Sequence, residues 1–324
     1  MSKASLGQFY TTRYKYIFDG MKKIKKSLIV IEPFCGKGDL LGYLNGNPTE
    51  LYDIDPKYPN TIKRDTLANP PEYQGKFVLT NPPYLARNKC KNKDIFEKYS
   101  QNDLYKCFIN NIIDDPPIGG LIIIPLNFWC SIRKSDCYLR KRFLEIFKIV
   151  RLNIFEEPVF NDTMYTVCGV LFVLRSDNTE EIDTYIYPGP KNIKLKLINW
   201  IIGGELYSLE NTGKYQVSRL LKGGSPNTKI FLKAIDDTKE KQICLCISKT
   251  PYFGKMSART YATLIIKPKI SERKQKEIVE KFNKILYDAR EKYHSLFLTN
   301  YRENTRKRIS FDLVYSIVLH ILSS

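Results

Sequence analysis

Apolar residues in the first half of the chain gather in short continuous runs, separated by segments of mixed polarity. "SLIVIEP" ends at a proline, and "FVLTN" stops at the two prolines that follow it. The runs occupy residues 27–33, 50–55, 77–81, 119–126, 147–155 and 168–174. Continuous apolar runs between helical segments are typical of strands buried on both faces, as in a parallel sheet covered by helices. The pattern therefore predicts a doubly wound α/β domain.

After about residue 177 the pattern changes to short strand-like pieces, interrupted by glycine and proline at 188–190, 203–204 and 222–227. From Ser271 onward, apolar residues recur at helical spacing and predict a long helix. The final apolar segment, 311–322, is expected to pack back as a second helix. The sequence therefore predicts two domains, residues 1–178 and residues 179–324.

The charge of the chain favours a polyanionic partner. Its 52 Lys and Arg residues outnumber 34 Asp and Glu, which gives a net charge of +18. Part of this excess lies between Arg259 and Arg308, where fourteen basic residues face six acidic ones. A basic surface of this size is typical of proteins that bind nucleic acid. A basic membrane surface is the weaker alternative, because no basic amphipathic helix stands apart from a core pattern.

The remaining composition predicts a cytoplasmic protein without a metal. No apolar run of membrane-spanning length occurs, and the first residues lack the apolar core of a secretory signal. The eight cysteines are scattered without a C-x-x-C pair, as expected in a reducing compartment. The two histidines, His294 and His320, have no metal-ligand spacing.

Two features at strand ends predict a nucleoside-like ligand. Gly36 and Gly38 follow the first strand directly, where glycine lets the backbone approach a ligand closely. The segment matches neither the Walker loop nor the G-x-G-x-x-G fingerprint. Asp53 ends the second strand, where an acid can accept both hydroxyls of a ribose. S-adenosylmethionine has a ribose and needs no phosphate-binding loop, so it fits this pattern.

An ordered set of motifs extends this interpretation. They are "GQFYTT" (7–12), "EPFCGKG" (32–38), "DID" (53–55), "NPPY" (81–84), "GGLIIIP" (119–125) and "VFNDTMYTVCGVLF" (159–172). In this order they resemble the adenine-specific DNA methyltransferases of restriction-modification systems of type II, which methylate the exocyclic N6 amino group. The resemblance covers about residues 5–175. The order of the motifs resembles that of the gamma class, in which a recognition domain follows the catalytic domain. It implies a mostly parallel, seven-stranded methyltransferase sheet and a smaller, basic C-terminal domain.

The resemblance implies a set of cofactor contacts. Phe9, Tyr10 and Thr11 would lie against the methionine end of S-adenosylmethionine, and Asp53 would hold its ribose. The cleft itself and the adenine of the cofactor would be lined by Glu32, Pro33, Gly36, Ile54, Asp65 and Phe108.

It also implies a site for the target base. The Asn81 side-chain oxygen and the Pro82 carbonyl would accept hydrogens from the amino group to be methylated, and Pro82 and Pro83 would keep both acceptors in place. Tyr84 would stack on an adenine swung out of the duplex. Phe160 would pack on the same base, although "NDTMYT" after it leaves Tyr165 as an alternative.

Double-stranded DNA is the expected partner of the second domain. Phosphate contacts, which position a protein without reading sequence, are expected from Lys249, Arg259, Arg302, Arg306, Lys307 and Arg308. The bases would be read from the polar loops 222–228 and 249–259.

Other functions remain open from the sequence. Methyltransferases of RNA adenine or guanine, and of protein glutamine amides, also carry "NPPY". A non-catalytic nucleic-acid binder is disfavoured by the intact Gly36, Asp53 and Asn81. The sequence does not choose between an enzyme that works beside a restriction endonuclease and one that marks DNA by itself. A monomer or weak dimer, and a bacterial or viral source, accord with the resemblance.

Overall fold

The computed structural model describes residues 11–160, 165–237, 240–300 and 306–324. The chain divides into two compact units. The first comprises Met1–Phe128 and Arg133–Lys196, and the second comprises Trp129–Ile132 and Leu197–Ser324. The first unit thus ends at Lys196 and not at residue 178, because two further strands continue its sheet beyond the expected boundary.

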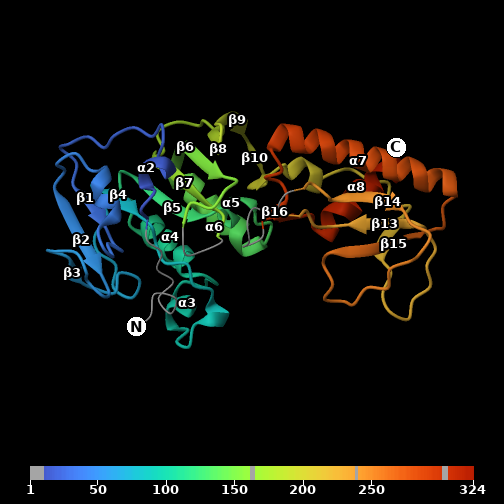
Figure 1. The fold of residues 1–324 in the computed structure, drawn as a ribbon, viewed down its shortest axis with the longest axis horizontal. Helices are drawn as coiled ribbons and strands as arrows, with labels where there is room; N and C mark the ends of the chain where they lie inside the picture. The colour runs from blue at the N-terminus through green and yellow to red at the C-terminus, as the bar shows by residue number, and fades with distance from the viewer. Residues whose placement is uncertain (1–10, 161–164, 238–239, 301–305) are drawn as a thin grey trace. The chain divides into compact units, whose positions relative to one another are not determined.

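A nine-stranded sheet forms the centre of the first unit (Figure 1), in the order β3-β2-β1-β4-β5-β7-β6-β8-β9. The strands are β1 (Val30–Glu32), β2 (Thr49–Asp53), β3 (Ile62–Lys63), β4 (Phe77–Thr80), β5 (Gly119–Pro125), β6 (Phe147–Phe155), β7 (Val167–Leu174), β8 (Ile182–Tyr187) and β9 (Lys191–Leu195). From β3 to β6 the neighbouring strands are parallel, except that β7 runs antiparallel to both β5 and β6. This confirms the expected α/β class with a mostly parallel sheet.

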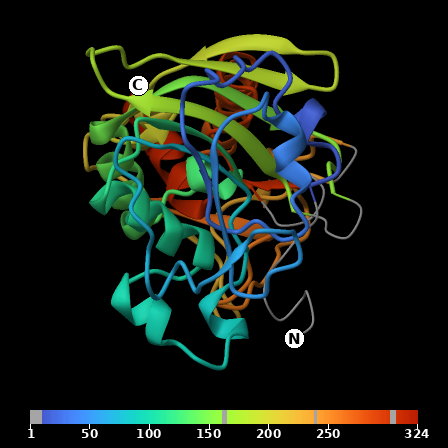
Figure 2. The same ribbon diagram turned by 90° about the vertical axis from the view of Figure 1, so that its left-hand side faces the viewer.

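Two strands exceed the expected seven. β8 pairs in parallel with β6, and β9 returns antiparallel to β8 at the edge of the sheet (Figure 2). In β8 buried and exposed positions alternate at first, as in a strand with one face toward the core. The continuous apolar runs that indicated the central strands are therefore missing here.

Helices lie against both faces of the sheet. The elements are α2 (Tyr14–Ile17), α3 (Asp94–Lys98), α4 (Leu104–Asp114), α5 (Asn127–Cys130), α6 (Lys134–Ile146), and the 3-10 helices η1 (Asp39–Tyr43) and η2 (Arg87–Lys89). On one face, Phe143 of α6 packs against Phe172 of β7 with ring centroids 5.3 Å apart. On the other face, a Cβ at Gly169 would lie 2.7 Å from the Ile17 carbonyl oxygen, so α2 approaches β7 closely.

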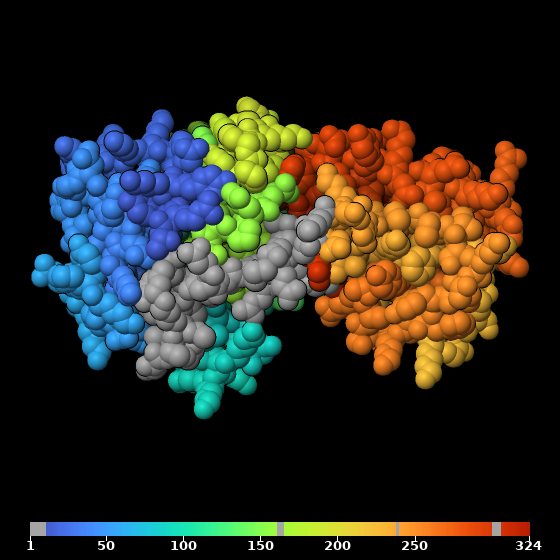
Figure 3. Space-filling model, in the orientation of Figure 1, coloured from blue at the N-terminus to red at the C-terminus, as the bar shows by residue number. Residues whose placement is uncertain are grey.

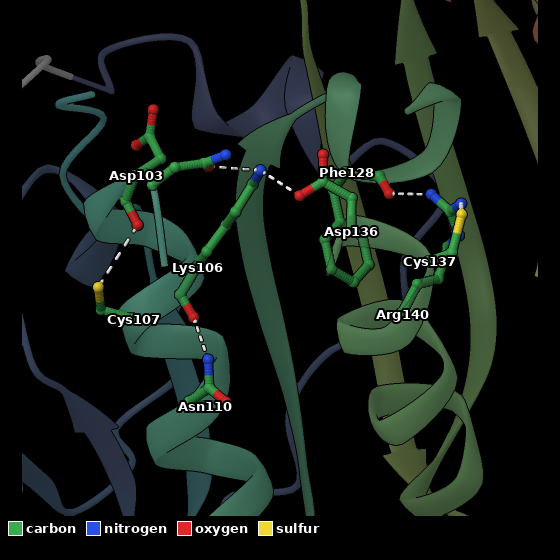
Figure 4. Close-up of polar contacts among 9 residues, drawn as sticks. Asp103, Lys106, Cys107, Asn110, Phe128, Asp136, Cys137 and Arg140 are labelled. Carbon is green, nitrogen blue, oxygen red and sulfur yellow. Dashed lines mark hydrogen bonds and ion pairs between the residues drawn. The ribbon is translucent and has the colours of Figure 1, made fainter. Parts of the chain in front are cut away.

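A buried ion pair joins α4 to α6 (Figure 4). Lys106 Nζ donates to Asp136 Oδ1 at 2.6 Å and to Asn102 Oδ1 at 2.8 Å. Both charged side chains are almost fully buried. Arg140 of α6 is fully buried as well, and it donates to the Phe128 carbonyl oxygen at 2.5 Å. These contacts fix the N-terminal end of α4 within the first unit.

The second unit contains a four-stranded antiparallel sheet in the order β12-β15-β13-β14. Its elements are β10 (Leu197–Ile198), β11 (Ile201–Ile202), η3 (Gly204–Tyr207), β12 (Gln216–Arg219), β13 (Ile230–Lys233), β14 (Cys244–Ile247), β15 (Tyr261–Lys267), α7 (Glu272–Tyr293), β16 (Thr299–Asn300), β17 (Lys307–Arg308) and α8 (Phe311–Ser323). The two predicted helices are confirmed as α7 and α8, capped by the side chains of Ser271 and Ser310. Within the ranges that the structure describes, no helix is long and apolar enough to cross a membrane.

A buried ion pair also connects the sheet of the second unit to α7. Both terminal nitrogens of Arg290 donate to the Asp236 carboxylate at 2.9–3.1 Å, and each side chain is 6% exposed. Asp236 Oδ1 also accepts the backbone N–H groups of Gln242 and Ile243. The carboxylate therefore compensates the buried guanidinium and holds the turn that leads into β14.

We expect Asp236→Ala to lower the free energy of unfolding of the second unit by about 3–5 kcal/mol, because it leaves the Arg290 charge buried without its partner. Urea unfolding followed by tryptophan fluorescence measures this, since Trp129 and Trp200, the two tryptophans of the chain, both belong to this unit. Asp288→Ala is the control. It removes an exposed pair with Lys284 on α7 and should cost about 0.5 kcal/mol or less. Equal losses in both variants would contradict this role of Asp236.

Candidate active site

The first unit has a topological switch point between β1 and β4, because the chain leaves β1 toward β2 on one side and returns to β4 on the other. Ligands of open α/β sheets bind outside the carboxyl ends of the strands at such a point. β1 ends at Glu32, β2 ends at Asp53, and β4 ends one residue before Asn81. Three residues singled out from the sequence therefore meet at one edge of the sheet.

A cavity of about 430 Å³ opens at this edge. This volume falls within the range of small-molecule and cofactor sites. Eight of the predicted site residues line it, namely Thr11, Glu32, Gly36, Asp53, Ile54, Asp65, Asn81 and Pro83. The lining also includes residues that the sequence interpretation missed, among them the apolar Phe34 and the acidic Asp39.

Glu32 is a buried acid on the cavity wall. Its Oε1 accepts the Thr80 hydroxyl at 2.5 Å and the Phe34 backbone N–H at 3.2 Å. Burial raises the pKa of Glu32 to about 8, against the lowering effect of these two hydrogen bonds, and the neighbouring Asp53 charge raises it further. A cation bound in the cavity would favour the ionised form of Glu32.

Asp53 is held by two backbone amides. Gly36 N–H donates to its Oδ2 at 2.7 Å, and Asp55 N–H donates to its Oδ1 at 2.8 Å. Each carboxylate oxygen keeps further acceptor capacity, so the side chain can still accept two hydroxyl groups from a ligand. Gly36 has φ +53°, and a Cβ there would meet no atom within 4 Å. Glycine thus permits the left-handed turn and leaves this part of the cavity open.

The Asn81 amide is held at both ends. Its Nδ2 donates to the Thr11 hydroxyl oxygen at 2.9 Å, and its Oδ1 lies 2.5 Å from the Tyr84 hydroxyl. Thr11 is itself fixed, because its backbone N–H donates to Asp39 Oδ2 at 2.9 Å. Thr11, which lies 70 residues before Asn81 in the chain, therefore fixes the orientation of the Asn81 amide.

Tyr84 is packed behind Asn81 and does not line the cavity. Its side chain is 2% exposed, and its hydroxyl also lies 2.7 Å from the Ile123 carbonyl oxygen. Tyr105 and Tyr165 contact the ring edge to face, with centroids 6.1 and 5.8 Å away. Of the two aromatic candidates named above, Tyr165 thus has its ring against Tyr84, whereas Phe160 is 4% exposed within the core.

Other predicted cofactor residues lie behind the wall or outside the described ranges. Phe108 is fully buried, and its ring centroid lies 5.4 Å from that of Phe34, which lines the cavity in its place. Phe108 therefore lies behind Phe34, in the core beside the cavity. Pro33 is buried, and its carbonyl accepts the hydroxyl of Thr66 on the wall. Pro82 is buried next to Asn81. The expected contacts of Phe9 and Tyr10 lie outside the described residues.

The predicted DNA-binding residues separate into two groups. Lys249 and Arg259 are exposed in the loop between β14 and β15. The cluster Arg306–Arg308 is half-buried, because Lys307 and Arg308 form β17 and pair with Thr299 and Asn300. Arg302 lies outside the described residues. The cluster is therefore less accessible to phosphate than its sequence suggests.

Lys249 also borders a second cavity, of about 500 Å³, together with Lys229 and Lys269. Within the described parts of the chain, the structure contains no group of three or more His, Cys, Asp or Glu side chains placed to hold a metal ion.

No protein-family model and no curated protein sequence matches this chain. Among solved structures, it is similar to a modification subunit of a type I restriction enzyme from Vibrio vulnificus YJ016, with 17% identity, a TM-score of 0.44, and 58% of this chain and 49% of that chain covered. It is also similar to a type I restriction-modification methyltransferase subunit from Streptococcus thermophilus, with 15% identity, a TM-score of 0.40 and coverages of 56% and 47%. A third similar structure is that of the type IIL restriction-modification enzyme MmeI in complex with DNA, with 13% identity and a TM-score of 0.42. The match covers 65% of this chain and 39% of that chain. The chain spans about half the length, or less, of these three proteins.

The raised pKa of Glu32 predicts a pH-dependent stability of the first unit. The folded state retains the Glu32 proton up to about pH 8, whereas the unfolded chain releases it near the ordinary value of 4.5. The stability that this group contributes is present below pH 4.5 and is lost as the pH rises toward 8. Glu32→Gln lacks this loss, so its melting temperature should rise relative to that of the parent by at least about 2 °C between pH 5 and pH 8.

Circular dichroism melting curves across this pH range measure the difference. Glu97→Gln, which changes an exposed carboxylate of α3, is the control and should follow the parent at every pH. A Glu32→Gln difference that stays constant with pH would show that Glu32 is ionised in the folded protein.

Proposed function

We propose that this protein transfers a methyl group from S-adenosylmethionine to the N6 amino group of an adenine in double-stranded DNA, at a specific site. One observation carries the proposal. The oriented amide of Asn81 borders the same cavity as the acids Glu32 and Asp53, at the switch point of a Rossmann-like sheet. An acceptor for an amino group and a site for a nucleoside-containing cofactor thus adjoin each other.

The cavity residues fit S-adenosylmethionine. Asp53 can accept both ribose hydroxyls, and the apolar Ile54 and Phe34 can cover the faces of the cofactor adenine. Asp65 adds an acceptor to this wall, and Glu32, once a bound cation favours its ionised form, can balance the charge of that cation. The bound cofactor supplies the electrophilic methyl group.

The chain contributes orientation to the reaction. Asn81 Oδ1 and the Pro82 carbonyl would accept the two hydrogens of the target amino group and direct its lone pair toward the methyl group. Because Asn81 Nδ2 is held by Thr11, the acceptor needs no reorientation when the amino group arrives. The Tyr84 hydroxyl, which now contacts Asn81 Oδ1, would yield its place to that amino group.

The target base has to leave the duplex, which costs a few kcal/mol. Stacking of the base on Tyr84 would recover about 1–3 kcal/mol of this. Since the Tyr84 side chain is 2% exposed, its ring must first be uncovered, and Tyr165 is the neighbouring aromatic whose movement would do so. The contact between the Tyr165 and Tyr84 rings supports Tyr165 as the second aromatic contact of the base, with Phe160 as the alternative.

The second unit is proposed to be the target-recognition domain. The net charge of +18 favours a polyanion, and the exposed Lys249 and Arg259 are suited to phosphate contacts. The proposed boundary follows the structural division at Lys196.

Incubation of the purified protein with isotope-labelled S-adenosylmethionine tests this function. Separate reactions contain duplex DNA, structured RNA and a protein mixture, and nucleoside digestion identifies the product. We expect label in N6-methyladenine from duplex DNA. Transfer to RNA or to a protein glutamine, with none to DNA, would contradict the proposal. Methylation-sensitive sequencing of plasmid from an expressing cell then identifies the target site.

We expect Asn81→Ala to lower turnover by about 100-fold or more, as found when one preorganised polar group of an active site is removed. The affinity for the cofactor should change by no more than a few-fold, because Asn81 would contact the target base. Single-turnover kinetics and calorimetric titration measure the two quantities. The matched variant is Asp53→Ala, which should weaken cofactor binding by about 1.5–3 kcal/mol and leave DNA binding intact. An Asn81→Ala protein as active as the parent would exclude the catalytic role.

Substitutions at Tyr84 should distinguish the contribution of its aromatic ring from that of its hydroxyl group. Tyr84→Phe retains the ring and should keep much of the activity, whereas Tyr84→Ala should lose base stacking. With 2-aminopurine at the target position, the parent and Tyr84→Phe should change the fluorescence of the base on binding as it leaves the stack. If the parent methylates the site but leaves the 2-aminopurine signal unchanged, the base is not flipped.

A further inference from the structure

The loop between β14 and β15, residues 248–260, exposes apolar side chains within a basic segment. Phe253 is 47% exposed and Met256 is 74% exposed. The loop contains three basic residues, Lys249, Lys255 and Arg259, and no acidic one. All three basic side chains are exposed. In Figure 1 the loop extends away from the sheet of the second unit, and Figure 3 shows this orange part of the chain at the surface.

The backbone of the loop is braced by residues that precede β13. Gly254 N–H donates to the Leu220 carbonyl, and the Gly254 carbonyl accepts the N–H of Lys222, both at 3.1 Å. The guanidinium of Arg219 donates to the carbonyls of Met256 and Ala258, each at 2.5 Å. These contacts hold the backbone between Phe253 and Met256 and after Met256. The loop therefore presents Phe253 and Met256 in a defined position.

Arg219 is itself restrained. Its guanidinium lies over the ring of Phe311, 4.7 Å from the centroid. Arg219 therefore stabilises the conformation of the loop. The charges available for phosphate contacts are those of the three basic residues within the loop.

A group of aromatic rings lies at the base of the loop. Phe231 stacks on Tyr261 with centroids 5.9 Å apart and an interplanar angle of 16°. Tyr252 contacts Tyr261 edge to face at 6.0 Å. Tyr261 is 39% exposed, so this group adds an apolar surface at the base of the loop.

Single exposed apolar residues are common on protein surfaces, but two at the tip of a braced, cationic loop favour a function. Phosphate contacts need the cations alone. Apolar side chains such as Phe and Met are the ones that enter a groove of DNA and separate base steps. The charge of the loop complements a duplex, and both kinds of contact occur on the same surface.

We infer that the tip formed by Phe253 and Met256 enters a groove of the duplex and contacts bases, while Lys249, Lys255 and Arg259 bind the flanking phosphates. This inference rests on the proposed function. It assigns base recognition to apolar side chains in a loop that the sequence presented as polar.

The test measures binding of the full chain to a duplex that contains the methylated site and to a random duplex, over a range of salt concentrations. Phe253→Ala with Met256→Ala should lower the ratio of specific to random affinity by about tenfold, because the apolar contacts with base edges are lost. The salt dependence should stay unchanged. Lys255→Gln with Arg259→Gln should weaken binding to both duplexes alike and reduce the salt slope by about two.

Two further variants serve as controls. Tyr287→Ala removes a side chain of α7 that is 64% exposed and should change neither quantity. Phe253→Leu with Met256→Leu keeps apolar tips and should retain most of the specificity. If the leucine pair loses as much specificity as the alanine pair, apolar contact with the bases does not explain the specificity, and the inference is wrong.

The outcomes also separate this inference from the proposed function. A parent protein that binds S-adenosylmethionine but methylates no duplex DNA contradicts the function. A parent that methylates its site, together with an alanine pair of equal site preference, contradicts the inference alone. Self-association of the parent that the alanine pair abolishes would identify the tip as an interface between two copies of the chain, and would also overturn the inference.

Discussion

The pairing of β1 with β4 is the constraint on which the cavity depends. Val30 pairs with Phe77 and Ile31 with Val78, so β4 ends one residue beyond the end of β1. There the Thr80 hydroxyl donates to Glu32 and joins the strand ends directly. Asn81 then leaves the sheet beside a buried acid that needs no counterion, because its raised pKa keeps it protonated at neutral pH. A shift of one residue in this register would turn Thr80 away from Glu32 and remove Asn81 from the cavity.

Much of the first unit could be predicted from its sequence, because strands buried on both faces need continuous apolar runs. The edge strands β8 and β9 could not, since they are partly solvated and carry no such runs. The residues that end or directly follow strands, Glu32, Asp53 and Asn81, could be placed together because parallel strands end at one edge of the sheet. The contact between Thr11 and Asn81 could not, because it joins a segment near the N-terminus to a strand end 70 residues later. Phe34 and Phe108 show the limit for aromatic residues: helical spacing indicates burial but does not show which ring reaches the cavity.

The number of basic residues alone does not show how many of them are available to bind a partner. Arg140 and Arg290 are buried, and Lys106 lies in an ion pair between two helices. Arg219 supports a loop through carbonyl groups. These four cations stabilise the fold and contribute little to a surface that could attract a polyanion. The net charge of the chain therefore overstates its binding surface, and the position of each cation decides its role.

The chain crosses between the two units more than once. Residues 129–132 belong to the second unit although the segments on either side of them belong to the first, and the chain passes to the second unit again after Lys196. A recognition domain joined by one linker can be exchanged as a cassette during evolution or in the laboratory. Here a transplanted second unit would lack the four residues carried inside the first, and a cut at residue 178 would also strip β8 and β9 from the sheet and expose the edge of β6. Under the proposed function, a change of site preference is therefore more readily obtained by replacing a single loop than by exchanging the whole second unit.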